Sequence, residues 1–146
     1  MRSQKLDWVN IWLRDTRRET KFKKKVIRQT SPPFKCKDGF TVSIQAGESL
    51  YSTPREWNAE KYTAVELGYP SEEDPLIAKW AENPDDSGTN TVYGWVPVDV
   101  VNKLIDKHGG LDEKEYFVKK LAGKVYEIAG KVKIENDSDC DRHSRT

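Results

Sequence analysis

Residues 91–110, TVYGWVPVDVVNKLIDKHGG, decide the fold because two kinds of hydrophobic spacing meet at Pro97. The residues before the proline are β-branched or aromatic, which predicts a strand with Tyr93 and Trp95 on one face. After the proline, apolar residues recur at the spacing of a single helix face, and Gly109 follows where a helix would end. The apolar residues of this predicted helix are Val98, Val101, Leu104 and Ile105.

Shorter strands are predicted upstream of this unit. Apolar and polar residues alternate over 40–45, residues 62–67 are predicted as a second strand, and residues 26–29 as a short one before Pro32 and Pro33. Strands in sequence with helices at both ends favour an α+β fold. We expect a small, mainly antiparallel sheet with the 97–108 helix packed on one face, flanked by N- and C-terminal helices.

The sequence divides into four predicted segments. Residues 1–25 are a basic amphipathic helical arm, with a helix over 4–19, and residues 26–110 are the α+β core domain. Residues 111–134 are a C-terminal helix and extension, with Phe117 and Leu121 on its apolar face, and residues 135–146 are a disordered tail. Because the strands lie beyond the arm, we expect the core to fold without residues 1–24.

Charge is distributed unevenly along the chain. Residues 1–40 hold twelve Lys or Arg against four Asp or Glu, and residues 41–100 hold three against eleven. The net charge of +1 over 146 residues therefore hides a basic first quarter and an acidic middle. Such a basic segment can attract phosphate groups or this protein's own acidic loops, and both interpretations stay open at this stage.

Composition and cysteine spacing indicate in which cellular compartment we expect the protein. The chain contains no run of 18 apolar residues and no apolar segment near its start, so we expect neither a membrane helix nor a signal peptide. Its two cysteines lie far apart in sequence, which favours a reducing, cytoplasmic setting.

The stretch IRQTSPPF, residues 27–34, is a candidate recognition loop. A double proline follows a string of hydrogen-bond donors and precedes one large apolar residue, so we expect the donors and Ser31 to face solvent and Phe34 to be buried. Aromatic and basic residues of the sheet and of the next long loop can join the site. The candidate binding residues are Arg28, Gln29, Thr30, Tyr51, Arg55 and Trp95. A stiff turn that only satisfies local backbone groups is the alternative.

Nucleic acid is the alternative partner. The basic residues of the first segment would form a positive stripe, and affinity for phosphate needs little more than such a stripe. These residues are Arg14, Arg17, Arg18, Lys21, Lys23, Lys24 and Lys25. The acidic middle of the chain would oppose this binding.

Catalytic and metal motifs are missing from the sequence. No nucleophile elbow, phosphate-binding loop or closely spaced Cys/His pair occurs, and His108 falls at a helix end where it can cap carbonyls. We therefore expect no enzyme activity, no cofactor and no metal. A nucleotide hydrolase remains a third hypothesis.

Residues 26–110 resemble a family of small uncharacterised bacteriophage proteins through the stretches VIRQTSPPF, YTAVELGYPSE and TVYGWVPVDVVNKLIDKHGG. The resemblance implies a phage origin, expression in the host bacterial cytoplasm, and action on a host factor such as a defence system. We expect a non-enzymatic binding module whose partner is a host protein or a small anionic ligand, with no membrane association. Assembly into a homo-oligomer is left open.

Overall fold

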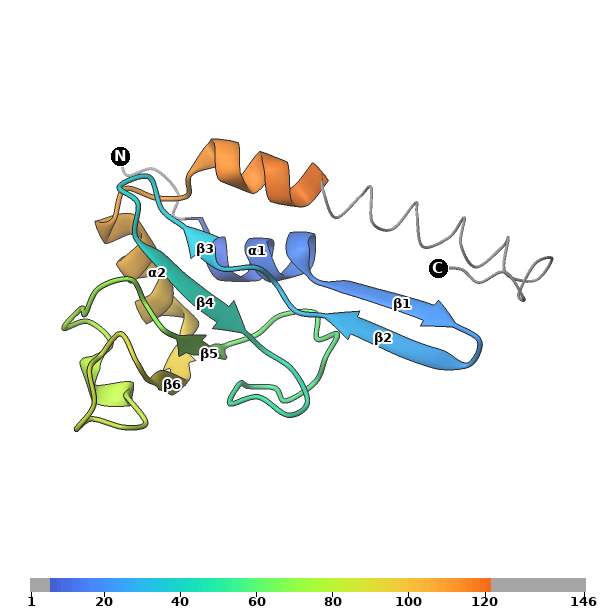
Figure 1. Ribbon diagram of the computed structural model, residues 1–146, viewed down its shortest axis with the longest axis horizontal. Helices are drawn as coiled ribbons and strands as arrows, with labels where there is room; N and C mark the ends of the chain where they lie inside the picture. The colour runs from blue at the N-terminus through green and yellow to red at the C-terminus, as the bar shows by residue number, and fades with distance from the viewer. Residues whose placement is uncertain (1–5, 122–146) are drawn as a thin grey trace.

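The computed structural model describes residues 6–121 (Figure 1). The chain begins with helix α1 (Trp8–Thr16) and continues through β1 (Arg18–Phe22), β2 (Lys25–Gln29), β3 (Phe34–Lys35), β4 (Thr41–Gln45) and β5 (Ala64–Gly68). A 3₁₀ turn, η1 (Ala78–Trp80), precedes β6 (Val92–Pro97) and helix α2 (Val98–Lys107). Residues 113–121 are again helical.

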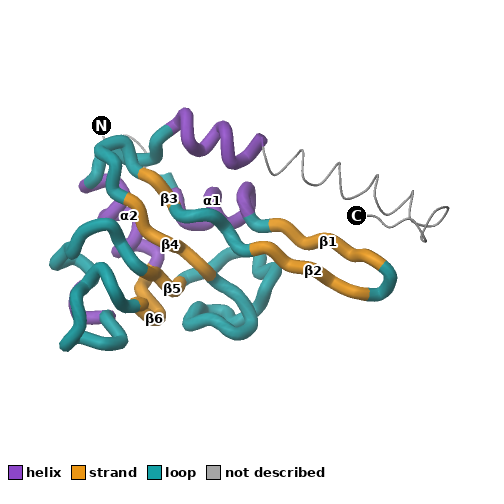
Figure 2. The backbone as a smooth tube through the Cα atoms, viewed as in Figure 1, coloured by secondary structure: helices purple, strands orange, loops and turns teal. Residues whose placement is uncertain are grey.

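The central sheet is antiparallel, with strand order β3-β4-β5-β6. Helix α2 follows β6 directly and packs against it, while α1 packs against both α2 and β4. The predicted α+β class is therefore confirmed, and so is the helix packed on the sheet. Figure 2 shows long loops between β4 and β5 and between β5 and β6, where the polar stretches of the sequence fall.

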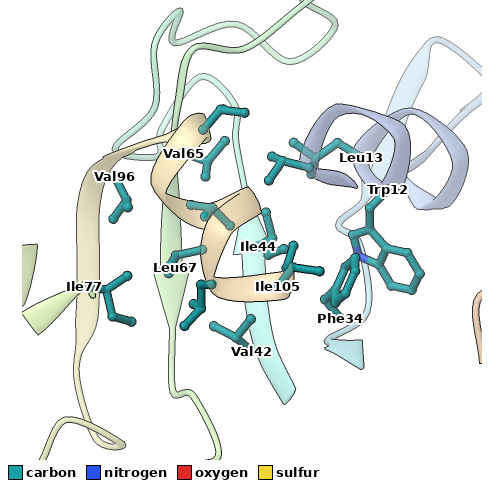
Figure 3. Close-up of a cluster of buried hydrophobic side chains, with 14 of the residues drawn as sticks. Trp12, Leu13, Phe34, Val42, Ile44, Val65, Leu67, Ile77, Val96 and Ile105 are labelled. Carbon is teal, nitrogen blue, oxygen red and sulfur yellow. The ribbon is translucent and has the colours of Figure 1, made fainter. Parts of the chain in front are cut away.

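The core lies between the two helices and the sheet (Figure 3). Alternation along β4 places Val42 and Ile44 inward, and α2 buries the four apolar residues that its spacing predicted. At the other end of the core, the rings of Trp12 and Phe34 meet edge to face with their centroids 5.0 Å apart. Edge-to-face contact of two buried rings adds to the stabilisation from apolar burial.

The predicted helical arm at residues 1–25 is wrong. Helix α1 ends at Thr16, and the basic residues after it form a β-hairpin in which β1 pairs antiparallel with β2. A two-residue turn, Lys23 and Lys24, joins the strands, and both residues have positive φ. Trp12 is 1% exposed. The segment thus contributes to the core, because the apolar face of α1 needs a partner to cover it.

The C-terminal helix differs from its predicted packing within the residues described. Phe117 and Leu121, the predicted apolar face, are 64% and 52% exposed. Tyr116 packs instead, with its ring near Trp12 and its hydroxyl donating to Asp15. The predicted continuation of this helix, its extension to 134 and the tail over 135–146 lie outside the described residues.

Candidate functional site

Two aromatic side chains, Tyr51 and Trp95, form a stacked pair on the surface. Their ring centroids are 4.6 Å apart at an angle of 21°, and the guanidinium carbon of Arg55 lies 6.0 Å from the Tyr51 ring. Arg55 is anchored by its Nε, which donates to the Leu50 carbonyl at 3.0 Å. We call Tyr51, Arg55 and Trp95 the aromatic platform. The fold thus brings together three of the predicted binding residues, from a loop and from β6.

Backbone geometry turns the Trp95 side chain outward. Trp95 has φ of +51°, and it is 48% exposed, whereas Tyr93 is 2% exposed. The prediction that these two residues share one face is therefore wrong, because the register between β5 and β6 shifts and breaks the alternation. A non-glycine residue at positive φ is unusual and marks a position that its surroundings hold in place.

The loop carrying Tyr51 is tied to the sheet beside the platform. The Trp95 amide donates to the Tyr51 carbonyl at 3.0 Å, and the Tyr51 amide donates to the Glu66 carboxylate at 3.0 Å. Gly94 permits this close approach, since a Cβ there would lie 3.0 Å from Cδ2 of Tyr51. The platform is consequently fixed by backbone contacts before any partner arrives.

Arg28 makes its contacts away from the platform. Its guanidinium pairs with Glu19 at 3.0 Å and with Glu48 at 2.9 Å, and it lies 5.2 Å from the ring centre of Trp57. These acids raise the pKa of Arg28, with the hydrogen bond to Glu19 the largest cause. Arg28 thus pairs with one acid of its own hairpin, Glu19, and with one acid of the acidic middle of the chain, Glu48.

The rest of the IRQTSPPF stretch divides between surface and core. Thr30 is exposed, and the side chain of Gln29, on β2, lies outside the description. Ser31 is 4% exposed and accepts a hydrogen bond from Thr16 at 2.7 Å, so its predicted solvent exposure is wrong. Phe34 is fully buried, as predicted. The residues next to the double proline therefore include two buried side chains, Ser31 and Phe34, as well as the exposed Thr30.

The basic residues predicted to bind nucleic acid fall into two groups. Arg14, Arg17 and Arg18 line a cavity of about 520 Å³, together with Trp57 and Tyr62. This cavity lies at the junction between the end of α1 and the start of β1. The lysines belong to the hairpin instead, with Lys21 on β1 and exposed side chains at its end: Lys23, Lys24 and Lys25. The arginines and the lysines thus lie on different parts of the fold, and nucleic-acid binding by these residues stays a prediction.

A buried histidine cluster escaped the sequence reasoning. His108 is 7% exposed, its Nδ1 lies 2.7 Å from an Asp38 oxygen, and its Nε2 lies 3.2 Å from an Asp74 oxygen. Phe40 stacks on the imidazole at 4.0 Å, and Lys107 pairs with Asp74 at 3.0 Å. The imidazole thus contacts a carboxylate oxygen through each of its two ring nitrogens. His108, at the end of α2, thus connects the loop that carries Asp38 with the loop that carries Asp74.

The buried Asp74 carboxyl is held in its charged form. Burial raises its pKa, but the Leu76 amide, Lys107 and His108 together bring the pKa below its usual value. The Leu76 amide donates to Asp74 at 2.9 Å, a local contact between residues two positions apart. The partnership with His108, 34 residues away, carries no local signal and could not be predicted from spacing.

Three other features of residues 6–121 bear on function: metal ligands, cysteine reactivity and the length of the helices. This part of the chain contains no group of His, Cys, Asp or Glu that could hold a metal ion. Burial raises the pKa of the Cys36 thiol to about 12, so this cysteine is a poor nucleophile. None of the helices in the described part is long and apolar enough to cross a membrane.

Comparison with known proteins gives one partial similarity. A 95-residue alignment is 35% identical to accessory colonization factor AcfD of Vibrio cholerae, and it covers 56% of this chain. The chain spans only about 6% of the length of that protein. No known protein family matches the chain, and no solved structure matches it either. The resemblance to bacteriophage proteins therefore stays a prediction.

Proposed function

We propose that this chain is a non-enzymatic binding module that recognises a host protein through the aromatic platform. The observation that carries the proposal is the exposed Trp95 ring, stacked on Tyr51 beside Arg55. Tryptophan, tyrosine and arginine are the residues that most often dominate the binding energy of protein interfaces. Here all three meet in one surface patch.

Preorganisation strengthens the case. Burying a mobile side chain at an interface loses conformational entropy, and a side chain that is already ordered loses less. The Trp95 amide bond to Tyr51 and the Tyr51 amide bond to Glu66 hold the platform in place without a partner. The platform is open at the surface, a shape that suits a protein partner.

The setting of this activity is also part of the proposal. The resemblance of residues 26–110 to phage proteins supports a phage accessory protein that acts in the host bacterial cytoplasm, counteracting a host defence factor. The absence of a metal-holding group in residues 6–121 is compatible with a role in binding.

A capture experiment tests the platform. Wild-type protein, Trp95→Ala and a matched control, Tyr69→Ala, are used as bait in bacterial lysate, and captured proteins are then purified for affinity measurement. Tyr69 is a suitable control because it is 60% exposed and also has positive φ, yet lies outside the platform. We expect Trp95→Ala to weaken binding of a purified partner by about 2 kcal/mol or more, as for interface hot spots. Equal affinities for all three proteins would contradict the proposal.

Nucleic acid binding is a second candidate function, favoured by the shape of the hairpin. β1 and β2 extend away from the body of the molecule (Figure 1), and exposed lysines gather at the end, which could follow a DNA groove. A mobility shift with duplex DNA tests this function at low and high salt. Binding that falls steeply with salt and is lost in Lys24→Glu would support it. No shift at low salt would exclude the hairpin as a DNA reader.

A further inference from the structure

The cavity at the junction of α1 and β1 contains an arginine without a counter-charge. Arg18 is 8% exposed, and its Nη1 donates to the Arg17 carbonyl. Its buried Nε has no hydrogen-bond partner, and no acid of residues 6–121 forms an ion pair with it. Arginine keeps its proton in proteins, so this charge cannot be relieved by deprotonation. A buried, unpaired guanidinium is unfavourable unless something negative approaches it.

Arg17, the preceding residue, lines the same cavity and is held by several contacts. Its Nη1 donates to the Ala46 carbonyl at 3.2 Å and to the Tyr62 hydroxyl at 2.9 Å, and its Nε donates to the Leu13 carbonyl at 3.3 Å. Its guanidinium carbon is 4.7 Å from the ring centre of Trp57. These contacts hold the planar group against an aromatic wall, a common arrangement for arginines that receive an anion. The cavity is therefore preorganised on one side by Arg17.

The charges around the cavity limit what it can hold. Three arginines line it, and so do two carboxylates, those of Glu19 and Glu60. One arginine, Arg14, is already paired with Asp15 at 2.9 Å. A polyphosphate or a nucleic acid backbone would be repelled by the two carboxylates, whereas one oxyanion group near Arg18 would be compensated. The carboxylates can in turn accept hydrogen bonds from hydroxyl or amino groups of the same molecule.

We propose that this cavity binds a small polar molecule through a single oxyanion group, phosphate or carboxylate, received by Arg17 and Arg18. The site shares no residue with the aromatic platform, so it can exist whether or not the platform binds a protein. Both residues line the cavity, and guanidinium groups suit such an oxyanion because their planar donors match its geometry. The volume of about 520 Å³ lies within the range of small-molecule sites.

Side-chain NMR of arginine Nε–Hε groups tests the proposal on the folded, full-length chain. Wild-type protein is titrated separately with inorganic phosphate and with acetate, and chloride at matched ionic strength is the reference. The signal of Arg18 is identified by its disappearance in Arg18→Met. We expect it to shift saturably with phosphate or with acetate, and the more effective probe tells which oxyanion the site prefers.

Two variants separate a binding role from a structural one. Arg18→Met should bind the preferred anion about tenfold more weakly or not at all, as expected for the loss of a charge-assisted donor. Without added anion it should unfold at the same temperature as wild type or higher, because it removes an unpaired buried charge. Lys24→Met, with the same charge change at the hairpin turn, should retain binding.

The wild-type titration decides the matter even if Arg18→Met fails to fold, since Arg18→Lys, which retains the positive charge but lacks the guanidinium Nε–Hε group, then serves to assign the Arg18 signal. An Arg18 signal that responds to phosphate and acetate only as it does to chloride would overturn the proposal. So would equal anion affinities of wild type and a folded Arg18→Met. Neither result would bear on the aromatic platform, which is tested by protein capture.

Discussion

Replacing Trp12 by alanine tests whether the first helix belongs to the core. The Trp12 side chain is 1% exposed, its ring meets Phe34 edge to face at 5.0 Å, and its indole N–H donates to the Pro32 carbonyl at 3.2 Å. Removing a fully buried aromatic ring typically destabilises a protein by about 3–5 kcal/mol. The lost hydrogen bond leaves a carbonyl without its partner, so we expect a value near the upper end.

Equilibrium unfolding in urea measures this change, with two companion variants. Trp12→Phe retains much of the ring volume but loses the N–H. It should therefore lower the free energy of unfolding by about 1–3 kcal/mol, the usual penalty of an unpaired buried polar group. Trp95→Ala removes an exposed indole of the platform and should change the free energy of unfolding much less than Trp12→Ala. A domain has about 5–15 kcal/mol in total, so the larger loss leaves a marginal protein.

The outcome also bears on the domain boundary. If α1 is part of the core, a variant lacking residues 1–24 should lose cooperative unfolding, contrary to the expectation drawn from the sequence. A change below about 1 kcal/mol for Trp12→Ala, with cooperative unfolding of the truncated chain, would refute the packing of α1 described above.

Three further predictions concern separate parts of the molecule. The pKa of Asp74 is lowered in the fold, so its stabilisation is full above the unfolded pKa of about 4 and is lost as pH falls through the folded pKa. Asp74→Asn should thus flatten the acid limb of stability measured by urea unfolding, and an unchanged limb would argue against this. Gly94→Ala should destabilise by about 1–3 kcal/mol and alter the near-ultraviolet circular dichroism of the Tyr51 stack, because the new Cβ would crowd that ring; an unaltered spectrum would count against the described contact. Replacing Lys23-Lys24 by Asn-Gly should stabilise the hairpin by about 0.5–1 kcal/mol, because both turn residues have positive φ. Slower amide exchange in β1 and β2 would show it, and faster exchange would contradict the assigned turn.

Much of the fold could be predicted from hydrophobic spacing. The helix over Val98–Lys107 and the strand over Thr41–Gln45 have unambiguous periods, and both formed where expected. The hairpin was missed because its turn is Lys23-Lys24, whereas the usual signal is Asn-Gly or Asp-Gly. The basic residues on either side of the turn continue the basic run that begins in the preceding helix. The sequence therefore shows no sign that the helix ends.

The candidate site could be predicted only where the residue type alone, aromatic or basic, suggests a role in binding. Tyr51 and Arg55 could be selected as aromatic and basic residues of a polar loop, and Trp95 as an aromatic residue of the sheet, and the three do meet. The burial of Arg18 could not be anticipated, because an arginine in a basic run is normally solvated. Pairings such as that of His108 with Asp38 depend on contacts across 70 residues of chain.

Local rules fail at several places in this chain, and two of these places belong to the proposed binding sites. Trp95 has positive φ although Gly94, the residue that would adopt it most easily, is its neighbour. Arg18 is buried, with its Nε unpaired, although it is the first residue of the hairpin strand β1. Each arrangement is unfavourable for stability alone, and such departures are expected where function imposes a geometry. If stability alone had shaped the sequence, an apolar residue at 18 and a glycine at 95 would serve the fold better. The chain has instead an indole turned to solvent and a guanidinium facing a cavity, and both are groups that recognise a partner.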